Sequence, residues 1–173
     1  MNLLSLFSPI KLFVFDVDGV MTDCGILLMP ESNYMRTMNM KDGFALQAAV
    51  KAGYKVIAIT GSHSKAVEER LLHLGIKEFY QKISDKATLL QKLITDNNLK
   101  PTEVLYMGDD IPDYTAMQIV GVRCAPADAC IDILQIADYV SPFNGGKGCV
   151  RDVQRGFDHR APLSCLSRWK IGR

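Results

Sequence analysis

Residues 15–22 read FDVDGVMT and close the first strongly apolar run of the chain. Asp16 and Asp18 stand two positions apart, so on an extended strand their side chains lie on one face, about 6.5 to 7 Å apart along the chain. Two carboxylates at the end of a buried strand can flank one reacting centre. With a second acidic cluster far downstream, they predict a site for magnesium-assisted phosphoryl chemistry.

Length and charge limit the classes of protein that fit the chain. Its 173 residues suit one domain, residues 1–173, with a substantial core. Twenty basic and nineteen acidic side chains give a net charge of +1, which argues against nucleic acid or a membrane surface and favours a small-molecule partner. The five cysteines form no Cys-x-x-Cys pair, so we expect reduced thiols in a cytoplasmic protein. Neither a signal peptide in residues 1–9 nor a membrane helix is expected.

Apolar runs alternate with amphipathic helical patterns along the chain, as in a sheet whose strands are joined by helices. Strands are expected at residues 12–17, 56–60, 78–80, 104–107 and 122–124, and more weakly at 139–140. Helices are expected at residues 42–52, 65–74 and 86–97. This order predicts an α/β fold, a doubly wound parallel sheet of Rossmann-like topology. Such a sheet binds ligands beyond the carboxyl ends of its strands.

One segment, residues 23–40, does not fit a simple crossover. Its loose alternation around the turn-rich residues 30–33 predicts a protruding β-hairpin. The segment contains four methionines, and in a monomer its apolar area would be exposed, which favours a subunit contact. The alternative is that these methionines pack back on their own domain.

Two later loops carry residues suited to holding phosphate. Thr60 and Gly61 end the second expected strand, where a hydroxyl and backbone N–H groups before a helix can bind phosphate oxygens. Lys86 opens the helix after the third strand and can balance the charges of a phosphate and a nucleophile. Taken alone, a Thr-Gly pair is usually an ordinary turn and a lysine is usually a solvated helix residue.

A third loop supplies the second acidic cluster. Asp109, Asp110 and Asp113 follow the fourth expected strand within five residues. Their mutual repulsion is relieved most simply by a bound divalent cation. The alternative is a charge cluster that complements the dipole of a helix N-terminus. The succession of four such strand ends favours one shared site.

This succession of motifs resembles the haloacid dehalogenase superfamily of phosphohydrolases, whose four motifs are matched by residues 16–20, Thr60, Lys86 and residues 108–110. Further resemblance points to the small, capless branch that hydrolyses 3-deoxy-D-manno-octulosonate 8-phosphate in lipopolysaccharide inner-core synthesis. The stretches that carry it are residues 18–21, 40–44, 84–86, 106–110 and 145–151. The resemblance implies no separate cap domain and a homotetramer in which the hairpins associate and a neighbour helps to close the active site.

The resemblance also implies roles for the acidic residues. Asp16 is the expected nucleophile, which forms an aspartyl-phosphate, and Asp18 is the expected acid and then base. Magnesium is expected on Asp16, the backbone carbonyl of Asp18 and Asp109, supported by Asp110 and Asp113.

The remaining roles concern the substrate. Thr60, Gly61 and Lys86 are expected to hold the transferring phosphoryl group. Weaker candidate contacts to the sugar acid are Lys41, Asp42, Lys147 and Arg151. The last two adjoin the glycine-rich residues 145–148, which in isolation predict a flexible turn.

Two departures from the family pattern bear on specificity. Ser62 and His63 stand where the family commonly has arginine, and His63 is expected to be a polar loop residue rather than a catalyst. The tail, about residues 158–173, lacks a helical apolar pattern and is assigned no function. Two other functions remain open: a phosphatase of a nine-carbon sugar acid 9-phosphate, and a catalytically silent tetramerisation module.

Overall fold

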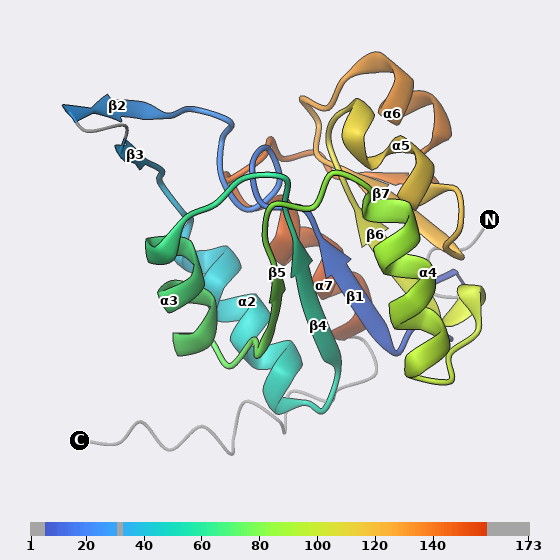
Figure 1. Cartoon of the computed structure of the whole chain (residues 1–173). Helices are drawn as coiled ribbons and strands as arrows, with labels where there is room; N and C mark the ends of the chain where they lie inside the picture. Colours follow the sequence, from blue (N-terminus) through green and yellow to red (C-terminus); the bar gives the residue numbers. More distant parts are fainter. Residues whose placement is uncertain (1–5, 31–32, 159–173) are drawn as a thin grey trace.

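The computed structural model describes residues 6–30 and 33–158 (Figure 1). Within these residues, six parallel strands form one sheet in the order β5-β4-β1-β6-β7-β8. Its strands are β1 (Leu12–Phe15), β4 (Lys55–Ile59), β5 (Glu78–Tyr80), β6 (Val104–Met107), β7 (Val122–Ala125) and β8 (Tyr139–Val140). The first strand in sequence, β1, therefore lies inside the sheet between β4 and β6.

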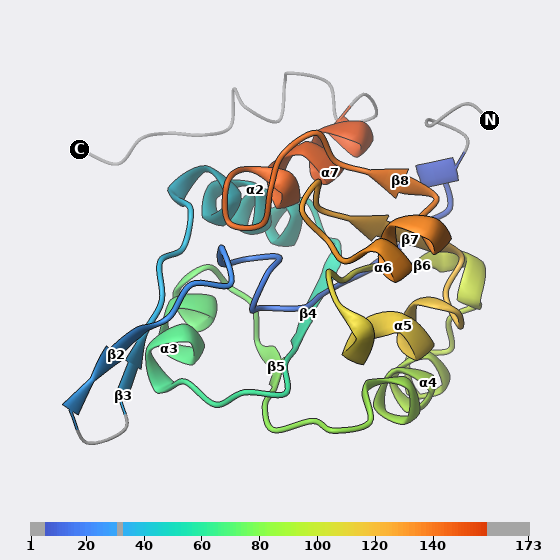
Figure 2. The same ribbon diagram turned by 90° about the horizontal axis from the view of Figure 1, so that it is seen from above.

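Helices cover both faces of this sheet (Figure 2). On one face lie α2 (Met40–Lys51), α3 (Lys65–His73) and α7 (Cys149–Asp158). On the other lie α4 (Lys86–Asp96), α5 (Ile111–Met117) and α6 (Ile131–Ile136). A short 3-10 helix, η2 (Pro101–Glu103), precedes β6. The predicted doubly wound α/β fold is confirmed.

The two cores meet at β1, whose side chains alternate between them. Phe13 and Phe15 join the core beneath α2, α3 and α7, whereas Leu12 and Val14 join the core beneath α4, α5 and α6. Successive side chains of a strand point to opposite faces, so a strand that is covered on both sides must be apolar throughout. All four side chains are fully buried, which explains the uninterrupted apolar run.

The observed elements differ from the predicted ones mainly at their ends. β1 ends at Phe15 rather than at residue 17, because the chain then turns so that Met21 N and Thr22 N both donate to the carbonyl oxygen of Val17. α2 begins two residues earlier than expected, after the N-cap residue Asn39. The helices α5, α6 and α7 were not predicted; α5 and α6 have only 7 and 6 residues, too few to display a helical period.

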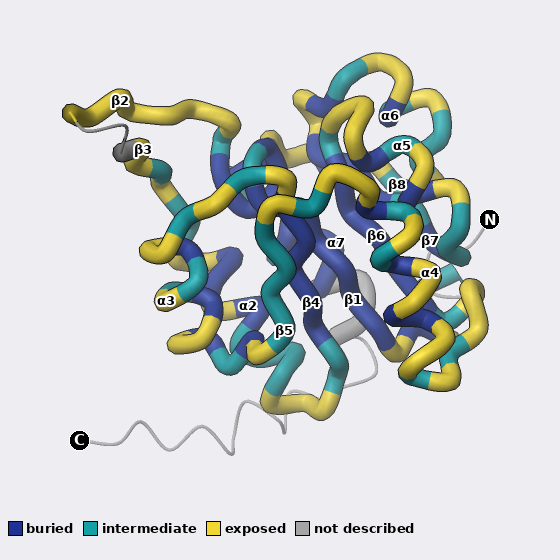
Figure 3. Tube along the Cα trace, viewed as in Figure 1, coloured by how far each residue is buried: buried dark blue, intermediate teal, exposed yellow. Residues whose placement is uncertain are grey.

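The predicted hairpin is confirmed and projects away from the sheet (Figure 1). β2 (Leu27–Met29) pairs with the antiparallel strand β3 (Asn33–Met35). Its apolar side chains face solvent: Leu28 is 69% exposed and Met35 is 56% exposed (Figure 3). Of the four methionines, Met38 packs against the core, so the alternative of packing back on the same domain holds for that residue, whereas the others are exposed.

Parts of the predicted segments fall outside the structure. Residues 31–32 at the hairpin tip and residues 159–173, which are most of the predicted atypical tail, lie outside the described residues. Among the helices that are described, none combines the length and the apolar character needed to cross a membrane.

Candidate active site

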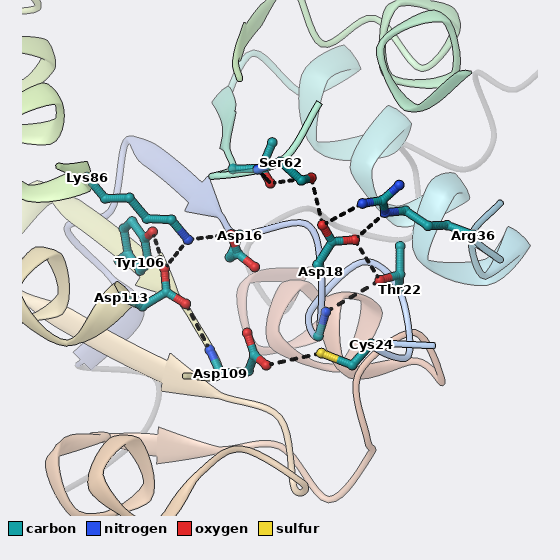
Figure 4. A network of polar contacts seen from close by, with 12 residues as sticks. Asp16, Asp18, Thr22, Cys24, Arg36, Ser62, Lys86, Tyr106, Asp109 and Asp113 are labelled. Atoms are coloured by element: carbon teal, nitrogen blue, oxygen red, sulfur yellow. Dashed lines mark hydrogen bonds and ion pairs between the residues drawn. The ribbon is translucent and has the colours of Figure 1, made fainter. Parts of the chain in front are cut away.

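The predicted site residues meet at one edge of the sheet. Asp16 follows β1, Thr60 follows β4 and Gly108 follows β6, and these three strands are neighbours. Lys86 arrives from the N-terminus of α4, after the adjacent strand β5. Because parallel strands end at the same edge, three loops and a helix start that are far apart in sequence converge (Figure 4).

A buried charge cluster lies at the centre of this edge. Lys86 Nζ lies 2.5 Å from Asp16 Oδ1 and 2.6 Å from Asp113 Oδ1, and all three side chains are at most 6% exposed. The hydroxyl of Tyr106 also donates to Asp113, at 2.7 Å. Burial raises the pKa of Asp16 to about 8, and the nearby Asp113 adds to the shift. The cluster thus holds more carboxylates than the single ammonium can neutralise.

The carboxylates of this cluster fit a divalent cation. Asp16, Asp109 and Asp113 each offer an oxygen, and these oxygens lie within 4.8 Å of one another. Burial, with Asp113 nearby, raises the pKa of Asp109 to about 7. An all-oxygen set of carboxylates is the donor set that magnesium prefers. Asp113 also contacts Lys86, Tyr106 and the backbone N–H of Asp109, which suits it to support the other two.

Asp110 does not join this cluster. It is exposed, and as the N-cap residue of α5 it makes no side-chain capping hydrogen bond. Its carboxylate contributes to the raised pKa of Asp109 only as a minor, through-space repulsion. Among residues 6–30 and 33–158, the Asp110 carboxylate therefore makes no bond to a candidate metal ligand, whereas the Asp113 carboxylate accepts from Asp109 N.

Gly19 lets the loop after β1 close over Asp109. Its φ is +102°, a backbone conformation that residues other than glycine rarely adopt. A Cβ at this position would lie 1.9 Å from Asp109 Oδ2. The glycine of the Asp-x-Asp-Gly motif is thus required both by backbone conformation and by the close approach of a candidate metal ligand.

Asp18 faces a different set of partners from Asp16 (Figure 4). Arg36 donates to both of its oxygens, through Nε at 2.5 Å and Nη2 at 3.1 Å, and Ser62 Oγ donates at 2.7 Å. Partial burial raises the pKa of Asp18, but hydrogen bonds from Arg36 and Ser62 outweigh it and hold this pKa below its usual range. From the sequence, both aspartates were expected to extend from one face of one strand. They do not, because β1 ends at Phe15, before both of them.

The loop after β4 connects Thr60 to Asp18. Thr60 is buried, and its Oγ1 lies 3.0 Å from Ser62 Oγ and accepts from Ser62 N at 3.1 Å. Gly61 is exposed between them. His63 is also exposed, with Nδ1 2.9 Å from Gln81 Oε1. These contacts fit the prediction that His63 is a polar loop residue.

Asp42 is buried and binds backbone amides of its own chain. It is 2% exposed, and its two carboxylate oxygens accept from Gly148 N at 3.1 Å and Arg151 N at 2.8 Å. Its carboxylate thereby caps the first turn of α7 from α2. The expected contact of Asp42 with a sugar acid stays a prediction, against which its burial and its two bonds to backbone amides count, whereas its neighbour Lys41 is exposed.

The glycine-rich residues 145–148 are not a free turn. Gly146 N donates to the carbonyl oxygen of Val20 at 2.9 Å, and a Cβ on Gly145 would lie 1.9 Å from the carbonyl oxygen of Gly19. The segment therefore packs against the loop that carries Asp18. Within the segment, the exposed Lys147 has its Nζ 2.7 Å from Asp23 Oδ2. The Arg151 guanidinium lies over the Phe44 ring, at 5.8 Å from its centroid.

Three residues at the site were missed by the sequence analysis. Arg36 and Tyr106 contact Asp18 and Asp113, and Cys24 Sγ lies 3.6 Å from Asp109 Oδ2. Burial, with the charge of Asp109, raises the pKa of the Cys24 thiol to about 12. Tyr106 stands in the resemblance stretch of residues 106–110 but was assigned no role there, and Arg36 and Cys24 stand in none of the motifs. Only the tertiary structure places Arg36 and Cys24 near the carboxylates.

Comparison with known proteins identifies relatives in sequence and in fold. The haloacid dehalogenase-like hydrolase family matches residues 38–127. The 3-deoxy-D-manno-octulosonate 8-phosphate phosphatase KdsC of Yersinia pestis is 37% identical over 146 residues, which cover 84% of this chain and 78% of the relative. A probable phosphatase of the YrbI family from Pseudomonas syringae has a similar structure, with a TM-score of 0.92, 31% identity, and 99% and 98% of the two chains covered.

A solved structure with ligands is also similar. It is the 3-deoxy-D-manno-octulosonate 8-phosphate phosphatase from Moraxella catarrhalis in complex with magnesium, phosphate and KDO. Its TM-score with this chain is 0.88 at 29% identity, with 95% of this chain and 97% of that chain covered.

Proposed function

The chain belongs to the haloacid dehalogenase-like hydrolases, and we propose that it is a magnesium-dependent phosphatase that hydrolyses 3-deoxy-D-manno-octulosonate 8-phosphate to the free sugar acid and phosphate. The observation that carries this proposal is the buried cluster of Lys86, Asp16 and Asp113 beside Asp109. Relatives that are 3-deoxy-D-manno-octulosonate 8-phosphate phosphatases match most of the chain, and the proposal therefore extends to lipopolysaccharide inner-core synthesis.

Hydrolysis proceeds in two balanced steps. A carboxylate oxygen of Asp16 attacks phosphorus, the bond from phosphorus to the sugar oxygen breaks, and Asp18 gives its proton to that oxygen. Water then attacks the phosphorus of the aspartyl-phosphate and gives a proton to Asp18. The bond between phosphorus and the Asp16 oxygen breaks, so phosphate is released and both carboxyl groups are restored. Asp16 suits the nucleophile's role because it is buried and held by Lys86. Asp18 lies half-buried at the same edge, and the hydrogen bonds that lower its pKa favour its carboxylate, the form that accepts the proton of the attacking water.

Magnesium fits the donor set of this site. Asp16 and Asp109 would hold it with the backbone carbonyl of Asp18, while Asp113 orients Lys86 and the backbone N–H of Asp109. When bound, the ion neutralises charge on the phosphoryl oxygens. Thr60, Gly61 and Lys86 would also hold those oxygens, with a buried hydroxyl, a loop N–H and an ammonium.

The sugar acid lies farther out in this proposal. Lys41, in the first turn of α2, and Lys147, which pairs with Asp23, are exposed cations, and Arg151 follows on α7. A carboxylate of the substrate is attracted to such cations, most specifically to a guanidinium. Lys147 is paired with Asp23 in this structure, so it would exchange that partner for the substrate.

The exposed apolar surface and the cysteines support a proposal for assembly and location. The hairpin exposes Leu27, Leu28 and Met35, which a contact between hairpins of a homotetramer would bury. We propose that residues 1–173 form one cytoplasmic phosphatase domain with this hairpin as an insertion. The described cysteines are free thiols, in agreement with a reducing compartment.

Phosphate release in the presence of magnesium tests this function. We expect release from 3-deoxy-D-manno-octulosonate 8-phosphate to exceed that from keto-deoxynononate 9-phosphate, and Asp16→Asn to abolish both without loss of folding. Asp132→Asn is a matched control, because Asp132 is an exposed carboxylate at the start of α6. A preference for the nine-carbon substrate would replace the substrate assignment. A folded protein that releases no phosphate would refute the phosphatase.

A further inference from the structure

Asp18 accepts hydrogen bonds from two separate parts of the chain. One donor is Ser62, in the loop after β4, and the other is Arg36, the residue directly after the hairpin strand β3. Thr22 Oγ1 lies 3.5 Å from Asp18 Oδ1, at the limit of a hydrogen bond, so Arg36 and Ser62 are the close partners.

Of these partners, only Arg36 contacts both oxygens of the Asp18 carboxylate. Its Nε donates to Oδ1 and its Nη2 donates to Oδ2. A guanidinium fork that bonds both oxygens fixes the plane of the carboxylate as well as its distance, which a single hydroxyl does not.

The environment of Arg36 restricts its movement. Its side chain is only 8% exposed, although the hairpin strands just before it are exposed. A long side chain loses considerable conformational freedom when it is buried in this way, so the pair with Asp18 must compensate for that loss. The position of Arg36 is thus well defined despite its place at the base of a projecting arm.

We infer that Arg36 is a positioning residue that aims the Asp18 carboxyl group at the leaving oxygen and then at the attacking water. This role rests on the proposed phosphatase function. Proton transfer requires that the carboxyl oxygen lie within hydrogen-bonding distance of the atom that it serves, in the right orientation. Rotation of an unheld carboxyl group would reduce the fraction of molecules in that geometry.

The way in which kcat/KM depends on the leaving group distinguishes a positioning role of Arg36 from a structural or substrate-binding role. A sugar alkoxide needs a proton as its bond to phosphorus breaks, whereas 4-nitrophenolate leaves readily without one. For Arg36→Met we expect kcat/KM to fall about 10- to 100-fold on the eight-carbon sugar acid phosphate and on an aldose phosphate without a carboxylate, and to change little on 4-nitrophenyl phosphate. Arg36→Lys, which keeps one charged donor, should recover part of the loss.

Two further variants make the test specific. Asp18→Asn should give the same dependence on the leaving group, and adding Arg36→Met to it should cause no further loss, because the two residues act as one unit. Arg123→Met is the matched control: Arg123 also bonds both oxygens of an aspartate, Asp138, at 2.9 and 2.8 Å, but on β7. Circular dichroism and size-exclusion chromatography establish that the variants fold and assemble.

Other outcomes would overturn the inference. An equal loss on all three substrates would indicate a general structural role for Arg36. A rise in KM confined to the sugar acid phosphate would indicate that Arg36 binds the carboxylate of the substrate instead. An unchanged kcat/KM would remove Arg36 from the reaction. If the parent protein releases phosphate from none of the substrates, the proposed function fails, and the role of Arg36 fails with it.

Discussion

Replacing Lys86 with methionine should destabilise the metal-free protein by about 3 to 5 kcal/mol, the usual cost of removing one partner from a buried ion pair. Lys86 is 5% exposed, and its Nζ lies 2.5 Å from Asp16 and 2.6 Å from Asp113. Methionine keeps a side chain of similar length, so little packing is lost. Two buried carboxylates would then face each other without a counter-charge.

Urea unfolding followed by circular dichroism in the presence of a chelator measures this cost. Burial already raises the pKa of Asp16 to about 8, and loss of the ammonium would raise it further. The folded state then binds more protons than the unfolded state, so stability falls as the pH rises, and the loss should be greater near pH 8 than near pH 6.

Lys55→Met is the matched control for this experiment. Lys55 also has two close partners, Glu78 at 2.5 Å and Asn97 at 2.6 Å, but its side chain is 33% exposed. An exposed pair contributes about 0 to 1 kcal/mol, because water screens both charges. Equal losses for the two lysine variants, or a loss for Lys86→Met that does not depend on pH, would refute the reasoning.

Three other perturbations test separate features. Magnesium affinity should rise between about pH 6 and pH 8, because the pKa values of Asp16 and Asp109 are raised to about 8 and about 7 and both carboxyl groups must lose their protons to bind the ion. Calorimetry in two buffers would detect the released protons. A magnesium affinity that does not depend on pH would contradict the assignment of these residues as metal ligands. Leu28→Glu, at a hairpin side chain that is 69% exposed, should lower the molar mass measured by light scattering, because a charge would be buried in the contact between hairpins. An unchanged molar mass would show that the hairpin is not a subunit contact. Asp42→Ala should reduce the free energy of unfolding by about 1 to 3 kcal/mol, with kcat/KM unchanged, because it leaves the backbone amides of Gly148 and Arg151 without their acceptor. A selective loss of kcat/KM would instead support Asp42 as a substrate contact.

Much of the fold was predictable because its strands are buried on both sides. A run such as Leu12–Phe15 must be apolar at every position when helices cover both faces, and such runs are visible in the sequence. The short helices α5 and α6 escaped prediction because 7 and 6 residues do not display a period. The N-terminal boundary of α2 was set by the side-chain cap at Asn39, which the apolar pattern does not reveal.

The chemistry of the candidate site could be predicted from the sequence, because the motifs around Asp16, Lys86 and Asp109 are local and parallel strands bring their carboxyl ends to one edge. The partners of these residues, in contrast, depend on the tertiary structure. It placed Arg36 on Asp18 and assigned Asp42 to the cap of α7, because both contacts join segments whose spacing in sequence carries no information on their distance. A motif specifies which groups are present, whereas packing of the loops specifies what each group can touch.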